Sequence, residues 1–511
     1  MMHDIVNEAV RQLPVPSQQQ LMSYVSEQTR AVVSTRRPRG KPATLSVMHL
    51  CLGIVLSGLE GFGSQLNLWR RLCLEPMGPF APVAVGDQAV YNRLARAAGA
   101  MRAFFEQVSG WIGEQVGGLE ERGVVPWACQ VLALDESTLD AVGRWLPELR
   151  GVLPGDPRLL AGRISALFDV RRQQWVRVEV WQEAVANCKL QARLLLEGLQ
   201  AGTLLLFDRG YLSFPWFDEL TDRQLHWISR YGNRISMQIK HILYQGDGVL
   251  DAIVWLGAYR ADRAKYPVRL VQFYHRGQLH RYLSNVLDAQ QLTLADIARL
   301  YARRWDIELA FCVLKEHLHL SQLWSAKWEV VQVQIWAGVL LAQLFHGLQV
   351  HLAAQEGVDP FDVSIDLLVE IVPRLLLRGI APLPYLGQYG RQVGLIRPST
   401  RLRVEVPLVD PRWITPAPPE ALRPRALGPP QVRARAAIHH QAQRARRYCG
   451  LYVAENIAVP ASATRAARPA NGTVMAGTDT PPGGGAAGRC SLSTAHSAAS
   501  DQRGKSAGVP A

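Results

Sequence analysis

The order of apolar runs between residues 131 and 181 constrains the fold more than any other feature of this sequence. The run 131-VLALDEST-138 is short and apolar before its acidic residues, which is typical of a strand buried in a sheet with Asp135 near its end. The segments 163-RISALFDV-170 and 174-QWVRVEVW-181 flank a polar turn, so they predict a β-hairpin after that strand.

The chain then alternates helix and strand signals. A helix is expected at 187–200, closed by Gly202 as a C-terminal stop. A second buried strand, 203-TLLLF-207, runs directly into Asp208, and strand-like sequence follows between about 226 and 287. This mixture of buried strands and helices predicts an α/β fold.

The stretch 301-YARRWDIELAFCVLK-315 predicts an ordinary amphipathic helix, because it contains no Gly or Pro and its apolar residues recur at helical spacing. Thr293 and Asp296 form a capping box where this helix would begin. Four polar residues fall within about 60° of one another around the helix axis; they are Tyr301, Arg304, Glu308 and Lys315.

The apolar stripe of the same helix lies beside this polar edge and consists of Leu300, Ile307, Phe311, Leu314 and Leu318. Glu308 therefore sits on the shoulder of the stripe, whereas Asp306 and Arg303 point well away from Glu308. A helix packed on a sheet could direct a carboxylate from this shoulder at the strand ends.

Three acidic residues then form a candidate metal site: Asp135, Asp208 and Glu308. Two divalent metals about 3.5–4 Å apart require hard carboxylate oxygens that converge from rigid elements, and strand ends with an abutting helix can provide them. Each residue alone has an ordinary explanation, since Asp is common after a strand and Glu on a helix is normally solvated.

Charge indicates the class of partner. Lys and Arg number 56 against 43 Asp and Glu, giving a net charge of +13 and a pI near 9.6, which favours a polyanion such as nucleic acid. The most apolar runs, 45–61 and 330–350, are short or interrupted by Gln and His, so buried helices explain them better than membrane spans. The sequence contains no G-x-x-x-x-G-K-[ST] loop, and we expect no nucleotide cofactor.

The two ends of the chain differ in composition. Residues up to about 125 have mostly helical patterns, and 83–99 resembles a short helix pair with a basic end that includes Arg93 and Arg96. From about Pro411 the sequence is rich in Pro, Ala, Gly, Arg and Ser, which cannot supply a core and predicts a disordered tail.

Taken together, these segments resemble a known family. The spacing of Tyr301, Arg304, Glu308 and Lys315 is Y-x2-R-x3-E-x6-K, similar to the signature of the insertion-sequence-4 family of bacterial DDE transposases. The segments around the two aspartates and the approach to the Glu helix also look like that family; they are 131–138, 208–220 and 282–308. With 85–97 included, the resemblance covers about residues 40 to 350.

The resemblance implies a ribonuclease H-like catalytic core interrupted by a mostly β insertion, with an N-terminal helical DNA-binding region and a disordered C-terminal tail. The expected divisions are 1–125 (N-terminal, DNA-end binding), 126–225 (first catalytic core segment, with both Asp), 226–290 (β insertion), 291–375 (second catalytic core segment, with the Glu helix), 376–410 (extension) and 411–511 (tail).

The resemblance also implies the chemistry. Two Mg²⁺ ions would be held by Asp135, Asp208 and Glu308, and Mn²⁺ is expected to substitute for them. Water would then cut the DNA at each transposon end, and the 3′-OH that this leaves would attack target DNA. By the same carry-over Tyr301, Arg304 and Lys315 would grip phosphates, and Arg209, Arg93 and Arg96 are further DNA-contact candidates. A homodimer on double-stranded DNA, in the bacterial cytoplasm at the nucleoid and away from membranes, is expected.

Two alternatives stay open from the sequence. One is a nuclease of the same fold that cuts DNA without strand transfer. The other is a non-catalytic DNA-binding protein derived from a transposase and acting as a repressor. The intact set of three carboxylates argues against the second alternative, because a binding protein has no need of them.

Overall fold

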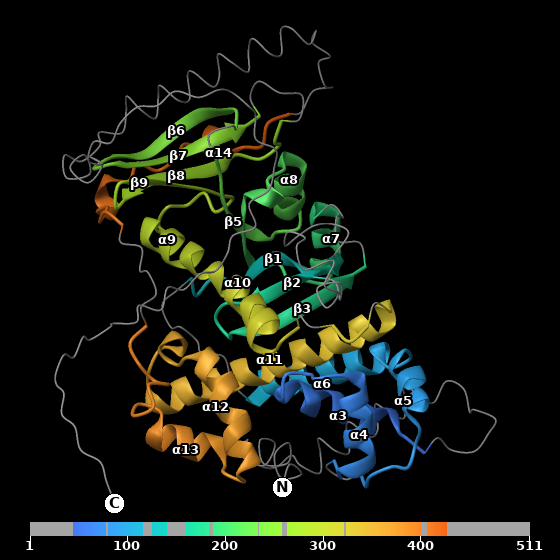
Figure 1. Ribbon diagram of the computed structural model, residues 1–511. Helices are drawn as coiled ribbons and strands as arrows, with labels where there is room; N and C mark the ends of the chain where they lie inside the picture. The colour runs from blue at the N-terminus through green and yellow to red at the C-terminus, as the bar shows by residue number, and fades with distance from the viewer. Residues whose placement is uncertain are drawn as a thin grey trace, which may run out of the picture.

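The computed structural model describes residues 44–77, 80–115, 125–140, 160–182, 188–232, 235–257, 263–320, 323–325, 327–399 and 406–426. The protein is a mixed α/β molecule built on one nine-stranded sheet of order β3-β2-β1-β4-β5-β9-β8-β7-β6 (Figure 1). The strands are β1 (Val131–Asp140), β2 (Leu160–Asp169), β3 (Gln174–Trp181), β4 (Leu204–Phe207), β5 (His226–Arg230), β6 (Met237–Gly246), β7 (Val249–Leu256), β8 (Val268–His275) and β9 (Gln278–Ser284).

The first five strands carry the predicted aspartates. β1 pairs antiparallel with β2, and β2 with β3, which confirms the predicted hairpin. β4 runs parallel to β1, and β5 runs parallel to β4. Alternation along these strands gives two buried faces, which we name the front face, packed against the helices of the Glu segment, and the back face, packed against α7 (Cys188–Leu195) and α8 (Phe214–Asp222).

The remaining four strands extend the same sheet. β9 pairs antiparallel with β5, and β8, β7 and β6 follow as an antiparallel meander. The strand-rich sequence between 226 and 287 therefore contributes to one continuous sheet, in which β5 joins the first four strands to β6–β9.

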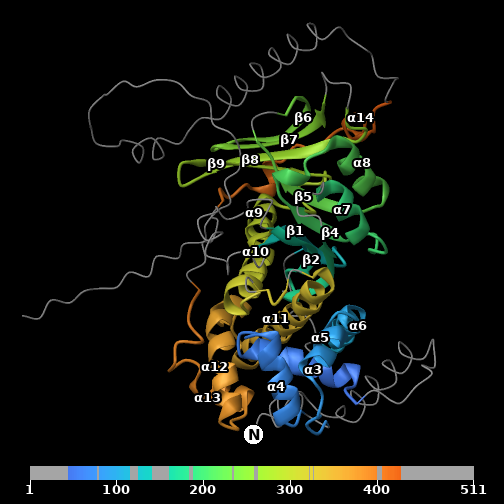
Figure 2. The same ribbon diagram turned by 45° about the vertical axis from the view of Figure 1, so that its right-hand side comes forward.

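Helices pack at the opposite end of the molecule from β6–β9 (Figures 1 and 2). They are α3 (Val47–Leu59), α4 (Gln65–Leu74), α5 (Asp87–Leu94), α6 (Ala98–Gln115), α11 (Trp328–Glu356), α12 (Ile365–Leu377) and α13 (Pro382–Tyr389). α11 contacts β3 as well as α3, α6, α12 and α13. By length and composition α11 alone among the described helices could cross a membrane, but 89% of its most apolar window is buried inside the protein.

Two helix predictions need correction. The helix expected at 187–200 ends at Leu195, well before Gly202, and turns follow it. The helix expected over 301–315 is not one regular helix: α9 (Leu294–Arg303) stops before Arg304, α10 (Trp305–Cys312) resumes after it, and a π-helical turn, η5 (Val313–His317), completes the segment. The amide of Arg304 bonds to the Tyr301 carbonyl oxygen at 3.2 Å, a tighter i→i+3 bond than an α-helix uses.

The predicted start of the disordered tail is also wrong. Residues 406–426, which include α14 (Pro419–Leu422), return to the strands β6–β8 and bind them; we name this segment the strap. The Thr415 amide donates to Leu243 O at 2.8 Å, and the Arg425 amide donates to Lys265 O at 3.0 Å. The composition did not predict this contact, because an extended segment can bind a sheet through backbone hydrogen bonds without any regular spacing of apolar residues. The rest of the predicted tail, 427–511, lies outside the described residues.

Candidate active site

Strand register brings the two predicted aspartates to the same level on the front face. The last parallel pair between β1 and β4 is Ala133 with Leu206, and Asp135 and Asp208 each lie two residues further on. Because side chains alternate along a strand, both aspartates share the face of Ala133 and Leu206, which belong to the front-face core. Adjacent strands are about 4.8 Å apart, so these carboxylates are neighbours.

Glu308 reaches the same place from a helix. It lies on α10, which packs against β1 and β2 through a buried side that includes Ile307 and Phe311. The charges of Asp208 and Glu308 both raise the pKa of Asp135, so the three carboxylates are within electrostatic reach of one another. The structure therefore places the three predicted acidic residues at one site.

Arg304 lies between two of these carboxylates. Its Nη1 is 3.2 Å from Asp135 Oδ2, and its Nη2 is 2.5 Å from Glu308 Oε1. Arg304 is only 5% exposed, whereas the Glu308 side chain is 34% exposed, so their pair is partly buried and differs from the fully solvated i,i+4 pair of an ordinary helix edge. Burial alone would lower the pKa of Arg304, but Tyr301, Glu308 and Asp135 raise it overall.

Burial dominates the electrostatics of Asp135. It raises the pKa of this carboxyl to about 7, against the opposing effects of the Arg304 guanidinium and the Glu136 amide. The Glu136 amide donates to Asp135 Oδ1 at 2.8 Å. A nearby cation stabilises the charged form of a largely buried carboxyl, and Arg304 supplies one in this structure.

Asp208 and Tyr301 are fixed by backbone contacts. Asp208 caps the short turn η4 (Arg209–Tyr211), and its Oδ1 accepts a 2.7 Å hydrogen bond from the Gly210 amide. Tyr301 is buried, and its hydroxyl donates to Phe207 O at 3.4 Å, at the residue directly before Asp208. Burial raises the pKa of Tyr301. Its hydroxyl thus braces the Asp208 turn, and the expected phosphate contact stays a prediction.

The other predicted DNA contacts are spread more widely. Arg209 is exposed beside Asp208, and Lys315 is partly exposed in the π-helical turn after α10. Arg93 lies in the last turn of α5 and Arg96 just beyond it, so both belong to the N-terminal helices and not to the carboxylate cluster.

Sequence reasoning missed one cation close to the site. Arg230 is the exposed last residue of β5, and its charge lowers the pKa of Tyr301. The signal was present, because Arg230 ends a parallel strand next to β4 just as Asp208 follows β4.

Asp306 was expected only to point away from Glu308, but in the structure it also makes buried contacts of its own. It is buried and accepts hydrogen bonds from Gln173 Nε2 at 2.9 Å and Arg303 Nε at 3.3 Å. Asp306 does lie apart from Glu308, but it neutralises a buried guanidinium. It is therefore a structural carboxylate.

The donor set suits a hard divalent cation. Carboxylate oxygens are the protein ligands that Mg²⁺ prefers, and here they come from two strands and a helix. As arranged in the structure, no three His, Cys, Asp or Glu side chains of the described residues stand close enough to hold an ion together. The Arg304 guanidinium lies between Asp135 and Glu308, so a cation can bind there only when the Arg304 side chain moves away from these carboxylates.

Part of the chain is similar to known proteins. Residues 162–344 match the family "Transposase DDE domain", a range that includes Asp208, Arg304 and Glu308 but begins after Asp135. A solved structure, the cryo-EM structure of the piggyBac transposase synaptic complex with hairpin DNA, matches at 13% identity over 77% of this chain and 85% of that chain, with a TM-score of 0.36, too low to carry an argument.

Two curated relatives are transposases. Transposase InsG for insertion sequence element IS4 of Escherichia coli (strain K12) is 30% identical over 206 residues, 37% of this chain and 46% of the relative. Putative transposase y4zB of Sinorhizobium fredii (strain NBRC 101917 / NGR234) is 26% identical over 150 residues, 28% of this chain and 41% of the relative. The matches span less than half of either relative's length. The part of the chain that contains the second aspartate and the Glu segment, residues 162–344, is therefore similar to the DDE domain of transposases.

Proposed function

We propose that this protein is the transposase of a bacterial insertion sequence. It binds the terminal inverted repeats, cleaves DNA phosphodiester bonds there and joins the 3′-OH ends to target DNA. The observation that carries the proposal is the convergence of Asp135, Asp208 and Glu308 on the front face of the sheet, within a chain whose residues 162–344 are similar to the transposase DDE domain.

The chemistry follows from charge. Cleavage places extra negative charge around phosphorus and on the leaving oxygen, and two bound Mg²⁺ ions would stabilise that charge and lower the pKa of the attacking water. Asp135, Asp208 and Glu308 would hold these ions, with Mn²⁺ as a substitute. Once it has moved away from Asp135 and Glu308, Arg304 offers a planar pair of hydrogen-bond donors to a phosphate. Lys315 and Arg230 then act as further positive charges beside the phosphate backbone of the DNA.

The topology supports a ribonuclease H-like core. The order β3-β2-β1-β4-β5, with β2 antiparallel to its neighbours and β1, β4 and β5 parallel, is the arrangement expected for that core. In this proposal β5 (His226–Arg230) belongs to the core, so the insertion begins after it with β6–β9 and not at residue 226 as expected from the sequence. The helices before β1 are the DNA-end-binding region with Arg93 and Arg96.

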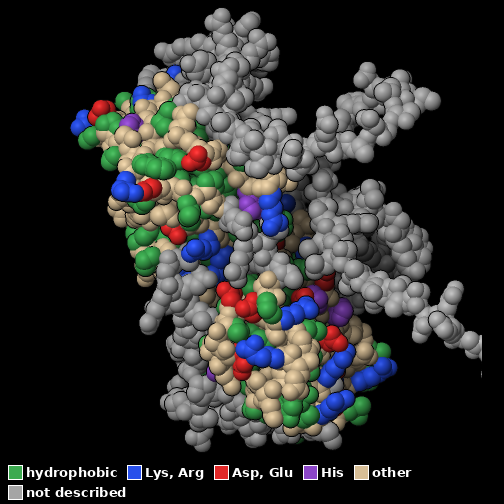
Figure 3. All heavy atoms as spheres, turned by 90° about the vertical axis from the view of Figure 1, so that its left-hand side faces the viewer, with side chains coloured by type: hydrophobic (Ala, Val, Ile, Leu, Met, Phe, Trp, Pro, Cys, Tyr) green, Lys and Arg blue, Asp and Glu red, His purple; other side chains and the backbone are tan. Residues whose placement is uncertain are grey.

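A basic surface supports DNA as the substrate. Figure 3 shows Lys and Arg side chains midway along one face and again on its helical lower part, with some Asp and Glu side chains between them. The net charge of +13 of the whole chain also favours a polyanion as partner. Two copies would act on the two transposon ends as a homodimer, in the cytoplasm at the nucleoid.

The proposal is tested by removing each carboxylate. Asp135→Ala, Asp208→Ala and Glu308→Ala should each abolish Mg²⁺-dependent cleavage of duplexes carrying the inverted repeats that flank the reading frame. Binding in a gel-shift assay should remain, because phosphate contacts supply most of the affinity. Glu316→Ala is the matched control, since Glu316 is exposed on the same segment. Normal cleavage by Glu308→Ala would refute the assignment.

Two further assays separate the alternatives. A nuclease without strand transfer would cut these duplexes but never yield the element at a new site in a plasmid-to-plasmid assay. A non-catalytic repressor would bind the repeats and show no cleavage with Mg²⁺ or Mn²⁺ in the parent protein.

A further inference from the structure

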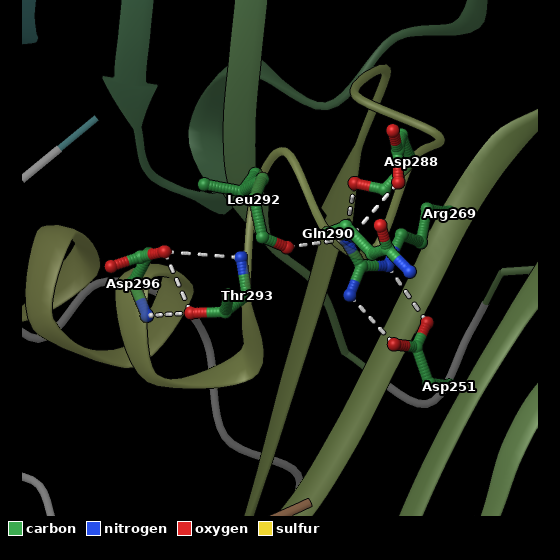
Figure 4. A network of polar contacts seen from close by, with 7 residues as sticks. All are labelled: Asp251, Arg269, Asp288, Gln290, Leu292, Thr293 and Asp296. Carbon is green, nitrogen blue, oxygen red and sulfur yellow. Dashed lines mark hydrogen bonds and ion pairs between the residues drawn. The ribbon is translucent and has the colours of Figure 1, made fainter. Parts of the chain in front are cut away.

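A buried ion pair joins β7 and β8. Arg269 is 1% exposed, and Asp251 is 5% exposed. The pair is bidentate, with Arg269 Nε donating to Asp251 Oδ1 at 2.8 Å and Nη2 donating to Oδ2 at 2.6 Å (Figure 4). A planar fork of this kind fixes the guanidinium plane as well as its charge.

The third nitrogen of Arg269 reaches outside the sheet. Nη1 donates to Leu292 O at 2.6 Å and lies 3.3 Å from Asp288 O. Both carbonyls belong to the connector between β9 and α9, residues 285–293. All three nitrogens of one buried guanidinium are therefore bonded, and the fork that grips Asp251 also aims Nη1 at this connector.

The connector that Arg269 binds ends where α9, the first helix of the Glu segment, begins. Leu292 directly precedes Thr293, the N-cap of α9. Thr293 and Asp296 form a complete capping box, with Asp296 N donating to Thr293 Oγ1 at 3.1 Å and Thr293 N donating to Asp296 Oδ2 at 3.1 Å. Figure 4 shows the ion pair, the connector and the capping box as one chain of contacts. The place where α9 begins is thus fixed from β7 and β8.

This anchor acts on Glu308 through the helices. At about 1.5 Å per residue, Glu308 lies about 22 Å along the helical segment from Thr293. In this inference α9 and α10 move together across the tight turn at Arg304, so a tilt of about 5° at the start of α9 moves the Glu308 carboxylate by about 2 Å. Metal coordination by carboxylates tolerates only a few tenths of an ångström. At its other end α9 is tied through Tyr301 to Phe207, next to Asp208.

We propose that Arg269 is a positioning residue for Glu308: it ties β7 and β8 to the start of α9 and thereby sets where the Glu308 carboxylate meets Asp135 and Asp208. The inference rests on the proposed function and adds a role for the strands β6–β9, which would hold the Glu segment in place. A purely structural ion pair would stabilise the fold without affecting metal binding.

The test uses two variants of the full chain. Arg269→Lys keeps a charge for Asp251 but cannot hold both carboxylate oxygens and the connector carbonyls in one fork. The double variant Asp251→Leu with Arg269→Met removes both charges together, so neither is left buried alone. Arg71→Met is the control, because Arg71 is similarly buried and pairs with Glu60 at 2.7 Å and Glu75 at 2.9 Å in the N-terminal helices.

Mn²⁺ binding by electron paramagnetic resonance and the Mg²⁺ dependence of cleavage are the main readouts. Both Arg269 variants should raise the half-saturating metal concentration about tenfold, the low end of the effect of losing a direct hydrogen-bond partner of a ligand, because Arg269 acts on Glu308 only through α9 and α10. Gel-shift affinity for end DNA should be unchanged. Excess metal should restore most of the cleavage. Arg71→Met should lower the melting temperature without shifting the metal dependence.

The outcomes separate this inference from the proposed function. If the parent cleaves DNA and both Arg269 variants keep the parent's metal dependence, the positioning role is refuted and the function stands. If the parent neither cleaves nor binds Mn²⁺ through Glu308, both are refuted.

Discussion

At the scale of single residues, Asp306 shows how position on a helix differs from environment. Its carboxylate pairs with the buried guanidinium of Arg303, so Asp306→Ala should break a buried ion pair and cost about 3–5 kcal/mol of unfolding free energy. Urea denaturation measures this loss. Glu316→Ala, on the exposed side of the segment, should unfold like the parent. Equal stability of Asp306→Ala and the parent would show that Arg303 finds another partner.

The aspartates and Arg304 show what residue patterns can and cannot predict. Two apolar runs that lead into Asp were enough to propose that Asp135 and Asp208 lie together. The strand β1 nevertheless continues past Asp135 to Asp140, so Asp135 lies in the middle of its strand and not near its end as predicted, and the parallel pairing of β1 with β4 that aligns the two residues was not predicted. The bridge from Arg304 to Asp135 was not predictable. It depends on the tight turn at Arg304, and helical geometry of about 100° per residue does not describe that turn or the π-helical turn after α10.

At the scale of elements, α11 contains a histidine that titrates far from its usual range. Burial lowers the pKa of His346 from 6.5 to about 4, although its contact with Gln349 raises it somewhat. The folded protein therefore keeps His346 neutral while the unfolded chain takes up a proton, so stability is lost as pH falls from 6.5 to about 4. The loss should be roughly 3 kcal/mol.

Unfolding free energies at a series of pH values measure this effect. His346→Leu removes the titrating group from α11, so the same pH series should be flatter by about that amount. A parent and variant with parallel pH profiles would mean that other groups cause the acid sensitivity.

The strap is the element that composition predicted worst. Its Ile414 and Ala417 pack with Leu243 and Ile253, and Arg425 bonds to Ala264 O at 2.7 Å. A chain ending at residue 405 should therefore lose about 2 kcal/mol of stability, the value of burying one large aliphatic side chain. A chain ending at Ala426 keeps these contacts and is the control. Thermal unfolding of both chains decides, and identical melting temperatures would show that the strap contributes nothing.

At the scale of the whole molecule, charge and topology act together. The structure confirms the predicted α/β class. This class was predictable because a chain that alternates buried strands and helices has few other ways to cover both faces of its sheet. The joining of β9 to β5 was not predictable, since a strand-like pattern does not specify its partner. That pairing lets β6–β9 extend the sheet that carries the carboxylates.

Salt dependence tests how the whole molecule holds DNA. Binding that releases counterions weakens with salt, and the slope of log K against log[salt] falls by about 1 for each phosphate that the protein no longer neutralises. If Lys315, just past α10, contacts backbone phosphate, Lys315→Ala should weaken binding to end DNA and unrelated DNA alike and flatten the slope by about 1. Lys240→Ala is the matched control, because Lys240 is exposed on the edge strand β6, where its Nζ lies 4.1 Å from the ring centroid of Trp255. Fluorescence anisotropy over a salt series gives both slopes. An unchanged slope for Lys315→Ala would exclude Lys315 from the DNA contacts, whereas a flatter slope for Lys240→Ala would extend the bound DNA over the far edge of the sheet.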